Sequence, residues 1–262
     1  MCGFAHTAMA ADLDYLRGSE VFAPGPALYP DWSGFYLGGQ VGYANAQMDF
    51  ATATASLVAR MLRNSSLESL ANVSQWSVLG PFDTRNVTYG ALAGYNVQFE
   101  NTVLGIEANY NHTSLSGSSS DTLSRQVTPG DGFTYNVTVS SLASLKLTDY
   151  GTLRGRAGYA VGQFLPYAMV GFAMGRFESL RSASVSGTFV PAGALGPVSN
   201  FAMSLDEPKA VYAYGYSLGG GVDVALLPCL FLRGEFEWVQ FANLQDVSAN
   251  FITGRVAAAY KF

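Results

Sequence analysis

The most constraining feature of this sequence is a two-residue alternation that recurs along most of the chain. In residues 86–100 every second side chain is apolar, and the residues between them are mostly polar or small. The same alternation occurs in residues 32–46, and again in residues 103–112 after a short turn at Asn101 and Thr102. Successive side chains of a β-strand point to opposite faces, so this period predicts strands with one apolar and one polar face.

Further segments with strand character bring the expected number of strands to eight: residues 147–161, 165–177, 211–226, 230–241 and 250–262. Their connections alternate in length. The turns near residues 101, 163 and 228 are short, whereas four intervening segments are longer and rich in Ser, Thr, Asn and Gly, namely residues 47–85, 113–146, 178–210 and 242–249. Short turns at one end and long loops at the other are typical of transmembrane barrels.

Composition and hydropathy favour the same fold. Hydrophobic residues make up 49% of the chain and charged residues only 13%, and there are 29 glycines, 15 tyrosines and 17 phenylalanines. Residues 157–175 carry no charge, but Gly162 and Pro166 divide them into two strands rather than one membrane-spanning helix. Hydrocarbon tolerates no unpaired backbone groups. We therefore predict an all-β fold, an eight-stranded antiparallel transmembrane β-barrel of the outer-membrane type, located in the cell outer membrane.

The predicted barrel occupies residues 32–262, and two segments precede it. Residues 1–10 are interpreted as a residual signal peptide, because Ala8-Met-Ala10 has the pattern of a cleavage site; the alternative is an ordinary N-terminus of small residues. Residues 11–31 contain three prolines and are predicted to be a flexible periplasmic N-terminal segment. Residues 57–73 have helical spacing, which indicates a short amphipathic helix that either orders the first loop or contacts lipid.

Charged residues of the predicted strands are assigned to the face that carries the small residues. On the lipid face an Arg or Lys would cost roughly 2–4 kcal/mol near the midplane, so this face is predicted to line the lumen. A barrel of eight strands is only wide enough for side chains. We expect a lumen charge network, with either internal packing or a narrow solute path as its role, formed by Glu100, Glu107, Arg154, Arg156, Arg176, Asp223, Arg233, Glu235, Glu237, Arg255 and Lys261.

The sequence gives little support for nucleic-acid binding, for a metal or cofactor site, or for catalysis. The 14 basic residues are scattered and the net charge is −5, so nucleic acid is not an expected partner. Two Cys and two His cannot form a metal set, and no cofactor is expected. His112-Thr-Ser114 resembles the His-x-Ser arrangement of outer-membrane lipid A deacylases, but no clear carboxylate partner for the histidine lies nearby. We therefore predict no catalytic residues and no enzyme activity.

Three segments carry a family resemblance. They are WSGFYLGGQVGY at residues 32–43, DYGTLRGRAGY at 149–159 followed by FLPYAMVG at 164–171, and GGGVD at 219–223 with RVAAAYKF at 255–262. They resemble the small outer-membrane barrels of alphaproteobacteria, the porin-family group that includes major surface antigens and hemin-binding proteins. The resemblance implies an eight-stranded barrel in the outer membrane. The ending also resembles the barrel-assembly signal, here Tyr260 and Phe262, which implies the barrel-assembly machinery as a transient partner.

The leading functional hypothesis is a structural and surface role in the Gram-negative envelope. Expected partners are outer-membrane lipid and lipopolysaccharide, together with peptidoglycan or other envelope proteins. One alternative is a narrow porin for small solutes. Another is surface binding through the loops, in adhesion or heme capture, with Trp76, Phe82 and Tyr110 as candidate contacts.

Overall fold

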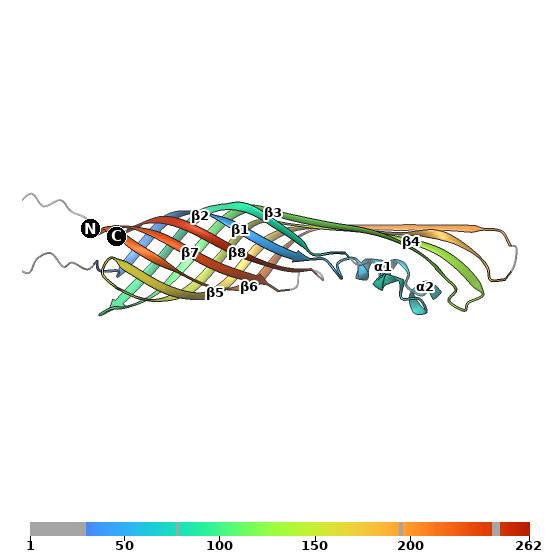
Figure 1. Ribbon diagram of the computed structural model, residues 1–262, viewed down its shortest axis with the longest axis horizontal. Helices are drawn as coiled ribbons and strands as arrows, with labels where there is room; N and C mark the ends of the chain where they lie inside the picture. Colours follow the sequence, from blue (N-terminus) through green and yellow to red (C-terminus); the bar gives the residue numbers. More distant parts are fainter. Residues whose placement is uncertain (1–29, 77–78, 194–195, 243–246) are drawn as a thin grey trace, which may run out of the picture.

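The computed structural model describes residues 30–76, 79–193, 196–242 and 247–262, and its main body is a closed β-barrel (Figure 1). Within these residues, eight antiparallel strands follow one another around the barrel in sequence order, and the last pairs with the first. The strands are β1 (Gly34–Asp49), β2 (Phe82–Phe99), β3 (Thr102–Val127), β4 (Phe133–Tyr159), β5 (Phe164–Pro191), β6 (Ser199–Leu227), β7 (Leu230–Phe241) and β8 (Ser248–Lys261). The predicted fold class is confirmed. The proposed signal peptide and most of the N-terminal segment lie outside the described residues.

The apolar and polar residues that alternate in the sequence lie on the outer and inner faces of the barrel wall, respectively. In β8, Ile252, Val256 and Tyr260 are exposed on the outside, whereas Thr253 and Arg255 are buried inside. β8 closes the barrel through a continuous register with β1, from Tyr36 opposite Lys261 to Asp49 opposite Ser248. Outward-facing apolar side chains suit lipid, and aromatic rings gather near the end that carries the chain terminus, where Phe262 lies 5.8 Å from Phe35 and 5.1 Å from Tyr260 between ring centroids.

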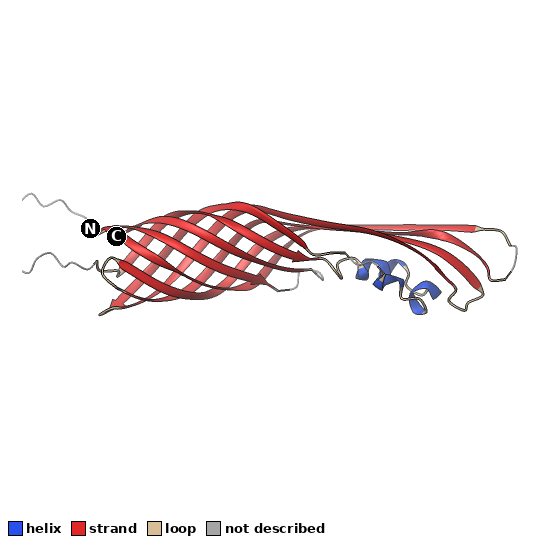
Figure 2. Cartoon of the chain, viewed as in Figure 1, coloured by secondary structure: helices blue, strands red, loops and turns tan. Residues whose placement is uncertain are grey.

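Four strands are much longer than the sequence predicted. β3, β4, β5 and β6 contain 26, 27, 28 and 29 residues, and they continue beyond the other four as a single sheet (Figure 2). We call this four-stranded sheet the extension. The predicted loops at residues 113–146 and 178–210 are therefore wrong, because most of these residues are paired strands. Their Ser and Thr content resembled a loop, but Thr is also common in strands, and apolar residues alternate with the hydroxyls.

Helices cover one face of the extension. The segment between β1 and β2 contains α1 (Ala55–Met61), α2 (Ser66–Ser69) and the 3₁₀ turn η1 (Val73–Gln75). Its apolar side chains, such as Leu57, Val58 and Leu62, are buried with Val137, Val139 and Val185 of the sheet. We call this cluster the cap. Of the two interpretations of the first loop, the structure supports ordering of the loop rather than contact with lipid. Among the described residues, no helix is long and apolar enough to cross a membrane.

Two further apolar clusters fill the barrel itself at different heights. The first, which we call the turn cluster, lies near the short turns and contains Trp32, Tyr36, Leu92, Val103, Leu165, Phe231, Ala257 and Ala259. The second, which we call the outer cluster, lies toward the extension and includes Phe50, Leu115, Tyr150, Phe177, Phe241 and Phe251. Their rings pack in contact, with centroids 5.0 Å apart for Phe177 and Phe241 and 4.9 Å apart for Tyr150 and Phe251. The charged residues of the lumen lie between these two clusters.

Candidate functional site

The candidate site is a charged layer inside the barrel, built from eight of the eleven residues assigned to the lumen. Five strands supply them, and each residue is at most 6% exposed. Four are cations and four are anions, so the layer is neutral: Glu107 on β3, Arg154 and Arg156 on β4, Asp223 on β6, Arg233, Glu235 and Glu237 on β7, and Arg255 on β8. Alternation on each strand turns every one of them inward.

Each arginine of the layer contacts more than one carboxylate. Arg154 donates to Glu107, to Glu235 at 2.7 Å and to Glu237 at 3.2 Å. Arg255 donates to the same two carboxylates of β7, at 2.5 Å for Glu235. Buried charges are tolerated when they are paired and hydrogen-bonded. This half of the layer therefore joins β3, β4, β7 and β8 across the lumen.

The second half of the layer centres on Asp223 and Glu107. Arg233 binds Asp223 with two hydrogen bonds, of 2.7 and 3.0 Å, and binds Glu107 at 2.6 Å. Arg156 donates to the same Asp223 at 2.6 Å. Paired donors of a guanidinium fix the geometry of a carboxylate more strictly than a single bond does. Glu107 thus connects both halves.

Two tyrosines belong to the layer although sequence reasoning did not include them. The Tyr36 hydroxyl donates to Glu107 at 2.6 Å, and the Tyr167 hydroxyl donates to Glu235 at 2.7 Å. The guanidinium carbon of Arg156 lies 3.9 Å from the centroid of the Tyr167 ring. A signal was present in the sequence, since Tyr36 shares the small-residue face of its strand. A glycine opposite each tyrosine leaves the space for its ring. A Cβ added at Gly94 would lie 2.3 Å from the Tyr36 hydroxyl, and one added at Gly221 would lie 2.8 Å from the Tyr167 hydroxyl.

Comparison with known proteins assigns the family. Residues 21–262 match the family model described as the outer membrane protein beta-barrel domain. The chain belongs to this family. It is an outer-membrane β-barrel protein, which places it in the cell outer membrane. No curated protein sequence matches the chain.

Solved structures similar to this outer-membrane protein are distant in sequence. Neisserial surface protein A has 13% identity and a TM-score of 0.38, covering 88% of this chain and 98% of that chain. Ail of Yersinia pestis, the attachment invasion locus protein, has 11% identity and a TM-score of 0.32, covering 88% and 99%. The outer membrane protease OmpT of Escherichia coli has 6% identity and a TM-score of 0.37, covering 89% and 97%.

Three residues assigned to the lumen lie elsewhere. Arg176 is exposed on the outside of the outer-membrane barrel, because the inward side chains of β5 are the odd-numbered ones. Glu100 is exposed in the turn between β2 and β3, with a φ of 53°. Lys261 is half-buried at the end of the barrel with the short turns, and its Nζ donates to the carbonyl of Asp31 instead of the layer. The network prediction was therefore wrong for all three, although Lys261 does share the inward, odd-numbered face of β8.

At the outer rim, His112 has a carboxylate partner, Asp149, that was not identified from the sequence. The Nδ1 atom of His112 lies 2.8 Å from Asp149 Oδ1, and the Tyr110 hydroxyl donates to the same oxygen at 2.7 Å. A register shift between Leu147 and Asp149 places this carboxylate on the outside of β4. Within the described part of the chain, no hydrogen bond joins Ser114 Oγ to His112. The cluster is therefore an imidazole, a carboxylate and a phenol, without an engaged nucleophile.

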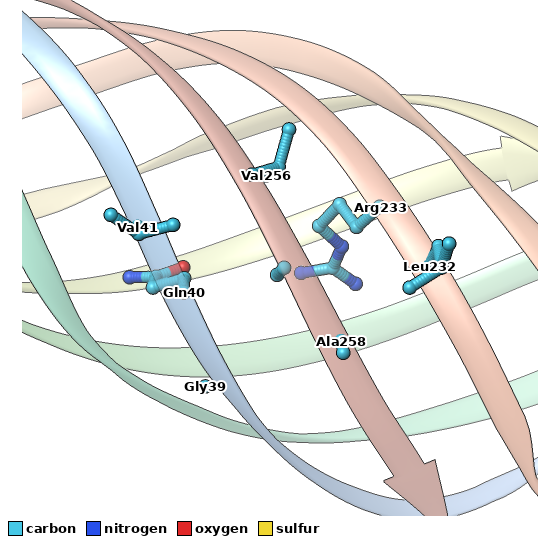
Figure 3. Close-up of a pocket in the computed structure, with 8 residues that line it drawn as sticks. Gly39, Gln40, Val41, Leu232, Arg233, Val256 and Ala258 are labelled. Carbon is cyan, nitrogen blue, oxygen red and sulfur yellow. The ribbon is translucent and has the colours of Figure 1, made fainter.

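The outer wall carries a shallow hollow over β1, β7 and β8 (Figure 3). Its exposed lining includes Val41, Leu232 and Val256, while Gln40 and Arg233 at its base are buried. The lining is almost wholly apolar, which suits lipid chains rather than a polar ligand. The described residues contain no group of three or more His, Cys, Asp or Glu that could hold a metal ion.

Proposed function

We propose that this outer-membrane protein is a closed, non-conducting barrel with a structural and surface role in the envelope. The filled lumen is the observation that supports this proposal most strongly. The charged layer is buried, and apolar clusters lie on both sides of it. An ion crossing the barrel would have to displace paired charges and two layers of packed side chains, which is unfavourable.

Liposome swelling tests the proposal against the narrow-porin alternative. Vesicles carrying the refolded protein are transferred into an iso-osmotic solution of a small neutral sugar, and light scattering is followed. The closed barrel predicts the same slow swelling as empty vesicles. Sugar-dependent swelling well above that of empty vesicles would instead support a porin.

Surface contact is the second proposed role, and the extension supports it. The end of β2 at Phe82 lies beside Gly117 of β3, so about 10 residues of β3, roughly 33 Å along the strand, continue past it. The extension and its cap therefore stand well above the membrane. Lipopolysaccharide, peptidoglycan and other envelope proteins remain proposed partners, as does the barrel-assembly machinery acting through Tyr260 and Phe262.

The finer family assignment and heme capture are also kept as proposals. The resemblance to alphaproteobacterial surface antigens and hemin-binding proteins rests on the three sequence segments. Of the candidate heme contacts, Tyr110 and Phe82 are exposed, but Trp76 is 8% exposed and packs in the cap beneath Arg125. A heme titration followed by absorbance tests this role, and an unchanged Soret band removes it.

We propose no catalytic role. The rim cluster of His112, Asp149 and Tyr110 is explained as a set of hydrogen bonds between the paired strands β3 and β4. Mass spectrometry of lipid A from expressing cells tests this statement. Acyl-chain removal that disappears in His112→Ala would contradict it.

A further inference from the structure

The outer part of the extension face opposite the cap is made almost entirely of uncharged hydrogen-bonding side chains, whereas the next row toward the barrel includes Leu142 and Asp206. It consists of the even-numbered residues in 122–126 of β3, 136–140 of β4, 184–188 of β5 and 200–204 of β6, and we call it the hydroxyl face. Eleven of these twelve residues are Ser, Thr, Asn or Gln, and the other is Ala202. All are exposed or partly exposed.

Strand pairing arranges these side chains in straight rows. One row crosses all four strands and consists of Thr122, Ser140, Ser184 and Ser204. Neighbouring members of the rows are hydrogen-bonded, at 3.1 Å for Thr122 with Ser140 and 2.8 Å for Ser124 with Thr138. Rows of this kind repeat at about 4.8 Å between strands and about 6.7 Å along a strand. The face is therefore a regular grid of donors and acceptors.

The grid stands on a rigid support. The odd-numbered neighbours Val137, Val139 and Val185 point to the other side of the sheet and are at most 1% exposed beneath the cap. Side chains held by a packed sheet lose little freedom when a ligand binds. The hydroxyl face is thus preorganised, although no segment among the described residues covers it.

The chemistry of the face excludes several kinds of partner. Its twelve positions carry no charge and the adjoining row adds only the anionic Asp206, so it offers nothing to nucleic acid or to sulfated and phosphorylated polymers. It has no aromatic, Met or Arg side chain, the residues that anchor protein interfaces. It also lacks the apolar surface that a lipid layer requires. What complements such a grid is a polymer whose own groups both donate and accept hydrogen bonds and carry no charge.

We infer that the hydroxyl face binds a neutral polysaccharide lying against the strands of the extension. Each Ser or Thr hydroxyl can donate one hydrogen bond and accept others, as each sugar hydroxyl can. Many weak bonds to a repeating chain add up only when their positions are fixed, which the grid provides. This inference rests on the proposed surface role, and it names the class of ligand that the extension would contact.

A glycan array that carries neutral and anionic glycans tests the inference with the full chain in lipid nanodiscs. The expected result is binding to neutral glycans that is unchanged between low and high salt, because no ion pair contributes. The test variant combines Thr122→Val, Thr138→Val and Thr188→Val, which keeps β-branched side chains and removes three hydroxyls. Its affinity should fall by about tenfold or more.

Ser69→Ala on α2 serves as the matched control, since it removes an exposed hydroxyl on the opposite side and should bind as the unmodified protein does. No binding to any neutral glycan, salt-sensitive binding to anionic glycans only, or equal binding by the triple variant would overturn the inference. Each result is independent of liposome swelling, so failure here leaves the closed lumen standing, and sugar-dependent swelling would not by itself remove glycan binding.

Discussion

Replacing Glu107 with Gln should destabilise the barrel more than any surface substitution. Glu107 accepts hydrogen bonds from Arg154, Arg233 and the Tyr36 hydroxyl, and it is 1% exposed. Gln has nearly the same shape but no charge, so the layer would hold four arginines against three carboxylates. Breaking a buried ion pair from one side costs about 3–5 kcal/mol. We therefore expect a loss of about 3 kcal/mol or more in the free energy of unfolding.

Urea unfolding of the protein refolded into lipid vesicles, followed by tryptophan fluorescence, measures this loss. Glu178→Gln is the matched control, because Glu178 is exposed on the outside of β5, and it should change stability by less than about 0.5 kcal/mol. Adding Arg156→Met to Glu107→Gln restores charge balance and leaves Arg233 on Asp223. The double variant should recover part of the loss, with a coupling energy of about 0.5–3 kcal/mol.

The reasoning is refuted if Glu107→Gln lies within about 1 kcal/mol of the unmodified protein, the range of a surface ion pair. It is also refuted if the double variant is simply the sum of the two single ones. Either result would mean that the layer is not a tightly paired network.

Four further outcomes follow from the structure. Leu62→Ala should cost about 2–5 kcal/mol in the cap only, seen as faster proteolysis of residues 55–75 with an intact barrel; a disrupted barrel would count against this. Gly94→Val should prevent normal folding, because the valine side chain would overlap Tyr36. A folded gel band in unheated SDS samples that shifts on heating, as for the unmodified protein, would contradict the packing. The hydrogen bond from Arg181 holds the pKa of the Glu207 carboxyl below its usual range, and Arg60 of α1 lies 3.6 Å from the same carboxylate. The stabilisation of the cap by Glu207 is therefore present above about pH 4.3 and is lost as the pH falls through the lowered pKa. Amide exchange in α1 should show this loss, and Glu207→Gln should not show it. Deleting Phe262 should lower insertion into the outer membrane, measured by fractionation, and unchanged insertion would argue against the assembly signal.

The barrel could be predicted from the sequence because lipid imposes a strict pattern on both faces of each strand. Leu104, Ile106 and Tyr110 alternate with Glu107 and Asn109, and the structure places them outside and inside in that order. A period of two gives the face of a residue directly once one neighbour is assigned. Arg176 was assigned to the inner face because it is charged. Its even-numbered neighbours Phe172 and Met174 are exposed on the outer face, and Arg176 shares that face.

The extension could not be predicted in the same way, because its outward side chains are mostly polar rather than apolar. Its outer residues are mostly Ser and Thr, which also form loops, and only the inner residues such as Val137, Val139 and Val185 reveal the strand period. The contacts of the charged layer were also out of reach. Pairing of Arg156 with Asp223 or of Tyr36 with Glu107 depends on the stagger between strands far apart in the sequence, which alternation alone does not specify.

The central claim, that the lumen is closed, is tested most directly by planar-bilayer recording of the purified, refolded protein. The closed barrel predicts no stable current steps above those of the bare bilayer, at either polarity and in low or high salt. Reproducible, ion-selective single-channel conductance from the unmodified protein would contradict the account, because it would require a path through the charged layer and both apolar clusters.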